Sequence, residues 1–580
     1  MVMDPLNPLI VQNDRTLLLD VHVPKAEAAR TAIMPFAELE KSPEHIHTYR
    51  ITPLSLWNAA GAGFAPQDII AVLRAYTRYE VPPGIEEEFF HTMARYGKIR
   101  LIPAHPGISA GTSDTEPLPA LPEELLLVSD DPAVLMEIEA AKGLARYVHK
   151  TPRGFSLHLK DRGTVKWELI KQGWPVKDEA PFVPGEPLDI EIRELSPEGI
   201  PFTPRPYQRE AAQAVLGSRG PGTGYGVVVL PCGSGKTVVG IILMAWLKTH
   251  TLILTPHIAA VRQWIRELLD KTALTKAQIA EYTGDLKAVA PVTVATYHIL
   301  TWRPHKTGDF PHFRVFRERS WGLIIYDEVQ LLPAPVFRIT AELQAVRRLG
   351  LTATLVREDG AEDAVFSLVG PKRYDVPWKD LEVKGWIAEA ICTEIRLDLP
   401  KPLKIPYAVA SSREKYRIAS ENPLKAGIVR RLVDTHGEDR ILIIGQYLEQ
   451  LASLAALLKA PLISGKTPQG ERETLYDGFR KSRFRLMVVS KVANYAIDLP
   501  DASMAIQVSG SFGSRQEEAQ RLGRILRPKG RRSAEDPSQG RYAYFYTLVS
   551  RNTVEEQFAA NRQQFLVEQG YTYAIQDWAG

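Results

Sequence analysis

The feature that most constrains the fold is a regular alternation of short apolar runs with longer helical segments, which begins near residue 226. The first series reads VVVL, TLILT, VTVAT, LIIYD and RLGLTAT and extends to about Lys384, and the second reads ILIIG, APLIS, RLMVVS, MAIQVS and AYFYTLV. Apolar runs of this length, separated by helical segments, are typical of parallel strands that are buried on both faces. The pattern predicts an α/β protein with two parallel sheets of similar design.

Length and composition limit the remaining choices. The chain has 580 residues, too many for one hydrophobic core, and its 45% hydrophobic and 24% charged residues are typical of a soluble globular protein. The net charge is only +3, so a polyanionic partner would have to be bound by local basic patches. Two cysteines, Cys232 and Cys392, exclude a disulfide scaffold and a Cys-rich zinc site, which indicates a reducing, cytoplasmic setting. We expect no membrane association, since Lys248 and His250 interrupt the longest apolar stretch.

Shifts in composition divide the chain into five segments. Residues 1–104 combine β-like runs such as RTLLLDVHV and YGKIRLI with the helical pattern PQDIIAVLRAYTRY, which predicts a small α/β or α+β domain. Residues 105–124 are rich in Pro, Gly, Ser and Thr and are predicted to be a linker. Residues 125–200 form a second small unit, with FSLHLKD as a strand and GTVKWELIKQGWP as a helix ended by proline. The two parallel sheets then occupy residues 201–384 and 385–580.

A phosphate-binding loop is indicated by the segment GSGKT, which comprises Gly233, Ser234, Gly235, Lys236 and Thr237. The glycines let the backbone curl so that consecutive N–H groups face a phosphate chain, and the N-terminus of the following helix adds partial positive charge. The lysine can reach the terminal phosphates and the threonine can ligate magnesium. Leu230 stands where the full pattern has its first glycine, which leaves a plain glycine turn as the alternative. The order strand, loop, helix nevertheless favours phosphate binding.

A pair of carboxylates follows the run LIIY. Asp327 is suited to a magnesium contact, and Glu328 to polarising the water that attacks a γ-phosphate. Such a pair at the end of a strand is often only a solvated turn, but its distance from the phosphate loop favours a nucleotide-hydrolysing pair. Upstream, Gln208 in RPYQREA has the donor and acceptor needed to read an adenine edge, although a glutamine on a helix is usually just solvated. The residues therefore predict hydrolysis of ATP or GTP.

The order of further motifs narrows the family. RPYQ, LPCGSGKT, LTPHIAAVRQW, YTGD, VATYHIL, DEVQ, GLTATLVRED, KVANYAIDLP and QRLGRILR follow one another along the chain. This order resembles the superfamily 2 helicases and, more narrowly, the XPB family of DNA helicases, for which GLTATLVRED is the most specific segment. The N-terminal passage HIHTYRITPLSLWNAA is similar to the domain that precedes the motor in that family. The resemblance implies two RecA-like motor domains that bind ATP between them.

The resemblance also implies roles for residues that are not distinctive alone. Arg524 and Arg527 would be arginine fingers that reach the transition state from the second motor domain, and Gln520 would contact the phosphate or its water. Asp498 would lie near the ribose, and Arg205 would join Gln208 at the nucleotide. Without the resemblance, QRLGRILR would be a basic helix face and the aspartate a helix cap.

DNA contact and its coupling to ATP are also implied by the resemblance. The positions that match the family's DNA-binding or coupling motifs are Thr255, Thr283, Gly284, Thr296, Thr352, Thr354, Arg357, Glu358, Asp359 and Lys491. Each alone is an ordinary strand or loop residue, so the prediction rests on their joint order. Residues 401–425 lie where the family carries a helical thumb that grips DNA, and a solvated helix is the equal alternative.

Three positions depart from the family or invite another assignment. Gln330 stands where the family usually has His after Asp-Glu-Val, so the coupling of hydrolysis to DNA could differ in strength. Ala496 stands where motif V often has glycine. His45 and His47 form an H-x-H pair, but ordinary packing is favoured over a metal site because no acidic residue or cysteine adjoins them.

The resemblance therefore implies an ATP-dependent DNA helicase or translocase of 3′ to 5′ polarity, acting in repair or transcription-linked unwinding. The expected cofactors are ATP and Mg²⁺, and the expected partner is DNA, single-stranded or forked duplex, without sequence preference. We expect a monomer in the cytoplasm, associated with the nucleoid if the source is prokaryotic; family analogy alone suggests a nuclease or another repair protein as partner. The residues leave open an ATP-switched DNA-binding assembly factor, or a double-strand translocase with little strand separation.

Overall fold

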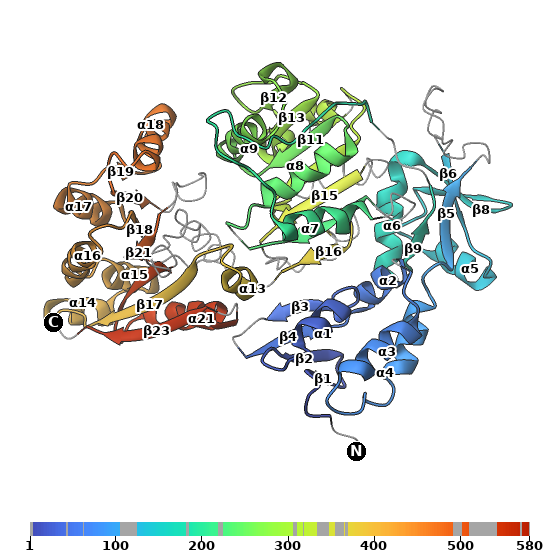
Figure 1. Cartoon of the computed structure of the whole chain (residues 1–580), viewed down its shortest axis with the longest axis horizontal. Helices are drawn as coiled ribbons and strands as arrows, with labels where there is room; N and C mark the ends of the chain where they lie inside the picture. The colour runs from blue at the N-terminus through green and yellow to red at the C-terminus, as the bar shows by residue number, and fades with distance from the viewer. Residues whose placement is uncertain are drawn as a thin grey trace. The chain divides into compact units, whose positions relative to one another are not determined.

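A computed structural model gives the structure of the chain, and Figure 1 shows its ribbon. The described residues are 4–41, 45–61, 63–104, 124–180, 185–217, 224–231, 233–305, 310–316, 318–332, 347–353, 365, 369–376, 378–490, 502–509, 542–568 and 571–578. The chain forms two compact units: the first extends to Asp375, and the second begins at Val376 and includes two short loops from earlier in the chain. Among the described helices, none has both the length and the apolar character needed to cross a bilayer.

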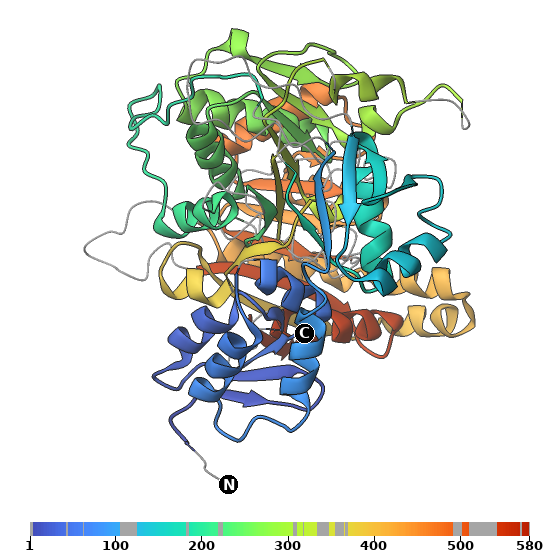
Figure 2. The ribbon, with the colours of Figure 1, turned by 90° about the vertical axis from the view of Figure 1, so that its right-hand side faces the viewer.

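A four-stranded antiparallel sheet and four helices form the N-terminal part of the first unit. The sheet has the order β1-β2-β4-β3. Its elements are β1 (Leu9–Val11), β2 (Thr16–Asp20), α1 (Ala26–Ile33), β3 (Glu38–Lys41), β4 (Ile46–Arg50), α2 (Pro53–Gly61), α3 (Pro66–Tyr76) and α4 (Ile85–Met93). The helices pack on the sheet (Figure 2), and fully buried side chains such as Leu17, Phe36 and Phe89 form the core between them. This arrangement is the α+β form of the predicted small domain.

A five-stranded sheet follows, with the order β7-β8-β6-β5-β9. Its elements are β5 (Ile99–Pro103), β6 (Glu124–Val128), α5 (Pro132–Ala140), β7 (Val148–Thr151), β8 (Gly154–His158), η1 (Leu159–Asp161), α6 (Arg162–Lys171) and β9 (Val176–Asp178). β5 pairs antiparallel with β6 and parallel with β9. The strand before the expected linker is therefore hydrogen-bonded between strands that follow it, so a boundary at residue 104 would separate β5 from its own sheet.

The first series of apolar runs forms a seven-stranded sheet with the order β12-β13-β11-β14-β15-β10-β16, in which every neighbouring pair is parallel. The strands are β10 (Tyr225–Val229), β11 (Thr251–Thr255), β12 (Ile279–Tyr282), β13 (Val292–Thr296), β14 (Leu323–Asp327), β15 (Arg347–Thr352) and β16 (Lys372–Asp375). The helices are α7 (Pro206–Leu216), α8 (Lys236–Leu247), α9 (Ile258–Lys271), η2 (Lys276–Gln278), α10 (Tyr297–Thr301), η3 (Pro311–Phe316) and η4 (Val329–Leu331). Central strands such as β11 and β13 are buried along their whole length.

The register of this sheet brings distant loops to one edge. Val229 at the end of β10 lies opposite Thr352 at the end of β15, and Thr255 at the end of β11 lies opposite Thr296 at the end of β13. β14, which pairs with β11 and β15, ends at Asp327. In parallel sheets the carboxyl ends of the strands are the usual place for a binding site.

The second series of runs forms a second seven-stranded parallel sheet with the order β19-β20-β18-β21-β22-β17-β23. Its strands are β17 (Glu389–Leu397), β18 (Ile441–Gly445), β19 (Leu462–Ile463), β20 (Leu486–Ser490), β21 (Met504–Gln507), β22 (Tyr542–Ser550) and β23 (Thr572–Asp577). The helices of this unit are α13 (Trp378–Val383), α14 (Lys401–Val409), α15 (Ser412–Ser420), α16 (Leu424–Thr435), α17 (Leu448–Leu458), α18 (Gln469–Arg480) and α21 (Val554–Glu568). The predicted α/β class with two parallel sheets, preceded by smaller units, is confirmed.

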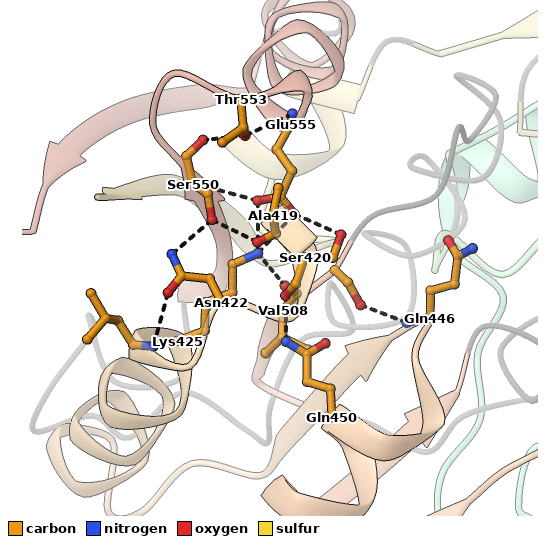
Figure 3. A network of polar contacts seen from close by, with 12 residues as sticks. Ala419, Ser420, Asn422, Lys425, Gln446, Gln450, Val508, Ser550, Thr553 and Glu555 are labelled. Carbon is orange, nitrogen blue, oxygen red and sulfur yellow. Dashed lines mark hydrogen bonds and ion pairs between the residues drawn. The ribbon is translucent and has the colours of Figure 1, made fainter. Parts of the chain in front are cut away.

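A buried ion pair ties several of these elements together (Figure 3). Lys425 in the first turn of α16 is 1% exposed and donates to the Val508 carbonyl at 2.8 Å and to Glu555 of α21 at 2.9 Å. Glu555 also accepts the Ser550 N–H at 2.9 Å and the Ser420 hydroxyl at 3.1 Å. Burial lowers the pKa of Lys425, and the attraction of Glu555 opposes that shift. The Lys425–Glu555 pair thus connects Val508, just after β21, with Ser420 at the end of α15 and Ser550 at the end of β22.

We expect Lys425→Met to lower the free energy of unfolding of the second unit by about 3–5 kcal/mol, because Glu555 would stay buried without its cation. Urea denaturation followed by circular dichroism measures the change. Lys481→Met is the matched control, since the Lys481–Asp477 pair lies on the surface and should change stability by less than about 1 kcal/mol. The double variant Lys425→Met/Glu555→Gln should recover part of the loss. Equal losses for Lys425→Met and the control would contradict the assigned role.

Candidate nucleotide site

The predicted phosphate loop lies between β10 and α8. Gly233 and Gly235 have φ values of 79° and 82°, in the left-handed region that favours glycine. α8 begins at Lys236, directly after the second glycine. The hydroxyl of Ser234 is buried and donates to the Pro231 carbonyl at 2.6 Å, so this side chain stabilises the loop itself. The loop therefore has the glycine conformations and the following helix N-terminus that a phosphate chain requires.

Gln208 packs against this loop from the neighbouring helix α7. Its Oε1 accepts the Arg205 N–H at 2.9 Å, and its Nε2 donates to the Gly235 carbonyl at 3.4 Å. A Cβ atom on Gly235 would lie 2.5 Å from that amide nitrogen, so a larger residue there would have to displace the Gln208 amide and would also adopt a left-handed backbone. The Arg205 guanidinium donates to the Tyr207 hydroxyl at 3.1 Å. Both residues thus lie beside the phosphate loop, while reading of an adenine edge by Gln208 stays a prediction.

The acidic pair lies across the same edge of the sheet. Lys236 Nζ is 4.0 Å from Glu328 Oε1, with side chains 11% and 18% exposed. Glu328 has a φ of 49°, a left-handed conformation that costs a residue with a side chain roughly 1–3 kcal/mol. Glu328 is the first residue after β14. Its left-handed conformation ends the alternation of side chains between the two faces of the sheet, and its carboxylate faces Lys236. The loop lysine and the predicted water-polarising carboxylate therefore meet, although 91 residues of chain separate their positions.

Asp327 accepts hydrogen bonds from Trp264 and Tyr297, which were not among the predicted site residues. The Trp264 indole N–H donates to its Oδ2 at 2.9 Å, and the Glu328 backbone N–H donates to its Oδ1 at 3.1 Å. The Tyr297 hydroxyl donates to the Asp327 carbonyl at 2.9 Å. Burial, together with the charge of Glu328, raises the pKa of the Asp327 carboxyl to about 6, and the Trp264 donor and the Lys236 cation oppose the rise. The signal in the sequence was present, since Trp264 ends LTPHIAAVRQW and Tyr297 lies in VATYHIL.

The residues at this edge fit a magnesium ion. Thr237 is half-buried on the first turn of α8 and offers a hydroxyl oxygen, and Asp327 offers a carboxylate. Oxygen ligands are those that Mg²⁺ prefers, and the ion usually keeps several waters and takes its other ligands from substrate phosphates. In the described part of the chain no group of three or more His, Cys, Asp or Glu side chains could hold a metal. A magnesium ion bound through nucleotide phosphates needs no such group.

Gln330 links the acidic pair to the end of β15. Its Nε2 donates to Glu328 Oε2 at 2.7 Å, and its Oε1 accepts the Thr352 hydroxyl at 2.6 Å. Both side chains are buried. The amide thus acts as donor on one side and acceptor on the other, which is the arrangement that a neutral histidine could also provide. The departure from the family's usual residue therefore preserves a continuous hydrogen-bonded chain and removes a titratable group.

The predicted DNA-contacting threonines do not present their hydroxyls to solvent. Thr255 donates to the carbonyls of His257 and Ala295, and Thr296 accepts the Ile299 N–H at the start of α10. Thr283, also buried, donates to Glu281 at 2.8 Å. Gly284, in contrast, is exposed, and a Cβ there would meet nothing within 4 Å. The three hydroxyls are therefore bonded within the protein, and the assignment of these threonines to DNA binding or coupling stays a prediction.

Several predicted site residues lie outside the described part of the chain. They are Thr354, Arg357, Glu358, Asp359, Lys491, Asp498, Gln520, Arg524 and Arg527. Cys232 and Ala496 also lie outside it. Their roles stay predictions. The described residues thus bring together the phosphate loop, the acidic pair and the end of β15, all within the first parallel sheet.

Three protein-family models match separate segments of the chain. The family described as the ERCC3/RAD25/XPB C-terminal helicase matches residues 381–578. The family described as the type III restriction enzyme, res subunit, matches residues 201–357. The family described as the helicase conserved C-terminal domain matches residues 9–151, near the other end of the chain.

Curated relatives match over almost the full length. A protein of Kineococcus radiotolerans named DNA 3'-5' helicase XPB is 50% identical over 98% of this chain and 96% of its own. A protein of the same name from Mycobacterium tuberculosis is 49% identical over 98% of both chains. The general transcription and DNA repair factor IIH helicase/translocase subunit XPB of Antonospora locustae is 33% identical over 98% of this chain and 81% of its own. With its motifs in order, two parallel sheets and these relatives, the chain belongs to the XPB family of DNA helicases.

Proposed function

We propose that this protein is an ATP-dependent DNA helicase or translocase that moves 3′ to 5′ on single-stranded or forked DNA. The observation that carries the proposal is the meeting of Lys236 and Glu328, 4.0 Å apart, beside the glycine loop and Asp327. Hydrolysis of a nucleoside triphosphate requires mainly positioning and charge stabilisation, which these groups supply. The names of the relatives at about half identity support DNA as the polymer and ATP-driven unwinding as the activity.

The described residues have distinct roles in this reaction. The backbone of Gly233 and Gly235 and the first turn of α8 bind the phosphate chain, and Lys236 binds the terminal phosphates. Glu328 accepts a hydrogen bond from the attacking water and orients it in line with the γ-phosphate. Thr237 and Asp327 would hold Mg²⁺, which when bound neutralises charge on the phosphates.

Further groups of the proposed site are assigned by their motifs in the C-terminal part of the chain. Arg524 and Arg527 stabilise the charge that develops on the γ-phosphate, Gln520 contacts the phosphate or its water, and Asp498 lies near the ribose. An arginine in this role contributes roughly 10³ to 10⁵ in turnover. The support for these assignments is the match of QRLGRILR and AIDLP to family motifs, within the part of the chain that matches the ERCC3/RAD25/XPB C-terminal helicase family.

DNA contact is proposed for surfaces of both units. In the second unit, α14 and α15 cover most of residues 401–425; α14 has no buried residue and α15 is buried on one side only, which suits a thumb that grips DNA. Gly284, Thr354, Arg357, Glu358, Asp359 and Lys491 are assigned to the path of the DNA strand by their motifs. Because a translocating enzyme must tolerate every sequence, these contacts go mainly to phosphates. For the small N-terminal domains we propose recognition of distorted DNA, at residues 125–200 in particular, with a protein partner as the alternative.

The cellular setting follows the relatives. A repair role suits a family that includes a subunit of a general transcription and DNA repair factor in Antonospora locustae. We propose a monomer that acts in the cytoplasm or on the nucleoid and that works with a repair nuclease or a comparable partner. The magnesium requirement belongs to the same proposal.

Lys236→Ala should abolish DNA-stimulated ATP hydrolysis, lowering the rate by at least about a hundredfold, because the terminal phosphates lose their cation. Phosphate release with and without single-stranded DNA measures the effect. Lys276→Ala, which removes an exposed lysine from the same sheet domain, is the control and should keep the wild-type rate. A wild-type rate that does not respond to DNA would contradict the motor. Unwinding of forked and tailed duplexes then gives polarity and separates a helicase from a double-strand translocase.

Thr352→Val should reduce the stimulation of ATP hydrolysis by DNA several-fold and change the DNA-independent rate little, because it breaks the Thr352–Gln330–Glu328 chain at its far end. Gln330→His gives a sharper test. A neutral imidazole can accept from Thr352 and donate to Glu328, whereas an imidazolium cannot accept. Stimulation in this variant should be retained above about pH 7.5 and fall towards pH 5.5, since an ordinary histidine has a pKa of about 6.5.

The measurement for both variants is the ratio of stimulated to basal ATP hydrolysis, followed across pH for Gln330→His. The wild-type ratio across the same range is the reference, because Asp327, whose pKa is raised to about 6, titrates there in both proteins; the ratio in Gln330→His should fall more than the wild-type ratio does. Thr393→Val, at a buried threonine of β17 in the other unit, is the control for loss of a buried hydroxyl. A pH-independent ratio in Gln330→His would show that this chain does not carry the coupling.

A further inference from the structure

Trp264 lies between the end of β14 and helix α8 in the first parallel-sheet domain. The side chain is 1% exposed, and its indole N–H donates to Asp327 Oδ2 at 2.9 Å. It belongs to α9, the helix that begins at Ile258, directly after the loop that follows β11. A tryptophan in a core normally needs only some partner for its single donor. Here that partner is the carboxylate proposed to hold magnesium.

The room for this ring is made by a glycine in the helix of the phosphate loop. Gly240 lies within α8, and a Cβ there would come within 2.7 Å of the Trp264 ring and 3.2 Å of Ile325. Glycine inside a helix costs about 1 kcal/mol relative to alanine, so its presence here is locally unfavourable. The contact places the indole against α8 at the same time as it bonds the end of β14. One side chain thus touches the two elements that carry Lys236 and Asp327.

The same helix α9 is tied to an exposed loop on another side. Arg262, two residues before the tryptophan, lies 3.7 Å from Glu281 and 3.8 Å from Asp285. Those acids flank Thr283 and Gly284, the YTGD segment proposed to follow the DNA strand. Residues two apart on a helix point to different sides, so α9 faces this loop with Arg262 and the nucleotide edge with Trp264.

We propose that Trp264 is a positioning residue that fixes the Asp327 carboxylate for magnesium and that transmits displacements of α9 from the YTGD loop to this carboxylate. The proposal rests on the proposed function, because it assigns a role within the ATP site. Oδ2 is held by the indole and Oδ1 by the backbone N–H of Glu328, so rotation of the carboxylate is restricted. A shift of α9 along its axis moves the indole and with it the oxygen that it holds.

Trp264→Phe tests the positioning role, since it keeps an aromatic ring and removes the donor. Titration calorimetry of MgCl₂ into the full chain with ADP should give a dissociation constant for Mg²⁺ about tenfold higher than wild type, the usual effect of losing a group that orients a metal ligand. Kinetics should show the matching rise in the Mg²⁺ concentration for half-maximal ATP hydrolysis, with the KM for ATP at saturating Mg²⁺ near wild type. DNA stimulation should fall at saturating Mg²⁺.

Gly240→Ala is the second variant, and it acts from the opposite side of the ring. Its Cβ displaces the indole without removing the N–H, so it should weaken Mg²⁺ binding in the same direction. Trp302→Phe is the matched control, because Trp302 is half exposed and should leave the Mg²⁺ affinity unchanged. Gly240→Ala also decides the outcome if Trp264→Phe does not yield folded protein.

The outcomes separate the two claims. If the wild-type chain lacks Mg²⁺-dependent, DNA-stimulated ATP hydrolysis, the proposed function fails. If the wild-type chain has that activity but the variants bind Mg²⁺ as it does, the role of Trp264 is overturned. A lower melting temperature with an unchanged Mg²⁺ affinity would show that the side chain only fills the core. Weaker Mg²⁺ binding with unaltered DNA stimulation would overturn the transmission from α9.

Discussion

The parallel register of the first seven-stranded sheet is the constraint on which the candidate site depends. Parallel strands all end at the same edge, so the loop after β10, the acids after β14 and the hydroxyl at the end of β15 lie together. That edge is crowded with polar groups, while the strands behind it are fully buried. Polar side chains at the ends of rigid strands form a site that is preorganised for its ligand.

At that edge of the sheet, two neighbouring carboxylates repel each other. Asp327 and Glu328 are adjacent carboxylates beside one lysine, and the first of them is buried deeply enough for its pKa to rise to about 6. The Trp264 donor and the left-handed turn at Glu328 hold the acids in place against their mutual repulsion. The proposed magnesium ion would favour the ionised form of the Asp327 carboxyl.

The two parallel sheets could be predicted from the sequence because strands buried on both faces consist of continuous apolar runs. β11, β13, β14 and β18 correspond to TLILT, VTVAT, LIIYD and ILIIG. Three of the four outermost strands of the parallel sheets were missed, β12, β16 and β23, whereas β19 corresponds to APLIS; KRYD of β16 is only half-buried. A strand covered on one side needs no apolar run, so composition cannot find it. β17, an interior strand, was missed as well, since EAICTEIRL intersperses charges.

The site was predictable at the level of motifs, but the contacts were not. Lys236 and Glu328 are identified by their motifs, whereas the indole of Trp264 looks in the sequence like any apolar residue of a helix. Its role follows from α9 packing on α8 at Gly240, a contact between residues 24 positions apart that local patterns do not encode. Local patterns also do not indicate that Thr255, Thr283 and Thr296 are buried, because a threonine at the end of a strand looks the same in the sequence whether its hydroxyl faces a ligand or the protein.

The position of β5 has a consequence for how the N-terminal region can be divided. This strand lies between β6 and β9, yet about twenty residues of Pro- and Ser-rich chain separate it from β6 in the sequence. A shortened chain that began after that stretch would keep four strands and lose an inner one, leaving two unpaired backbone edges open to self-association. Proteolysis at the same place would instead leave both pieces held by the ladder. Any truncated chain should therefore keep β5 together with the strands that follow it.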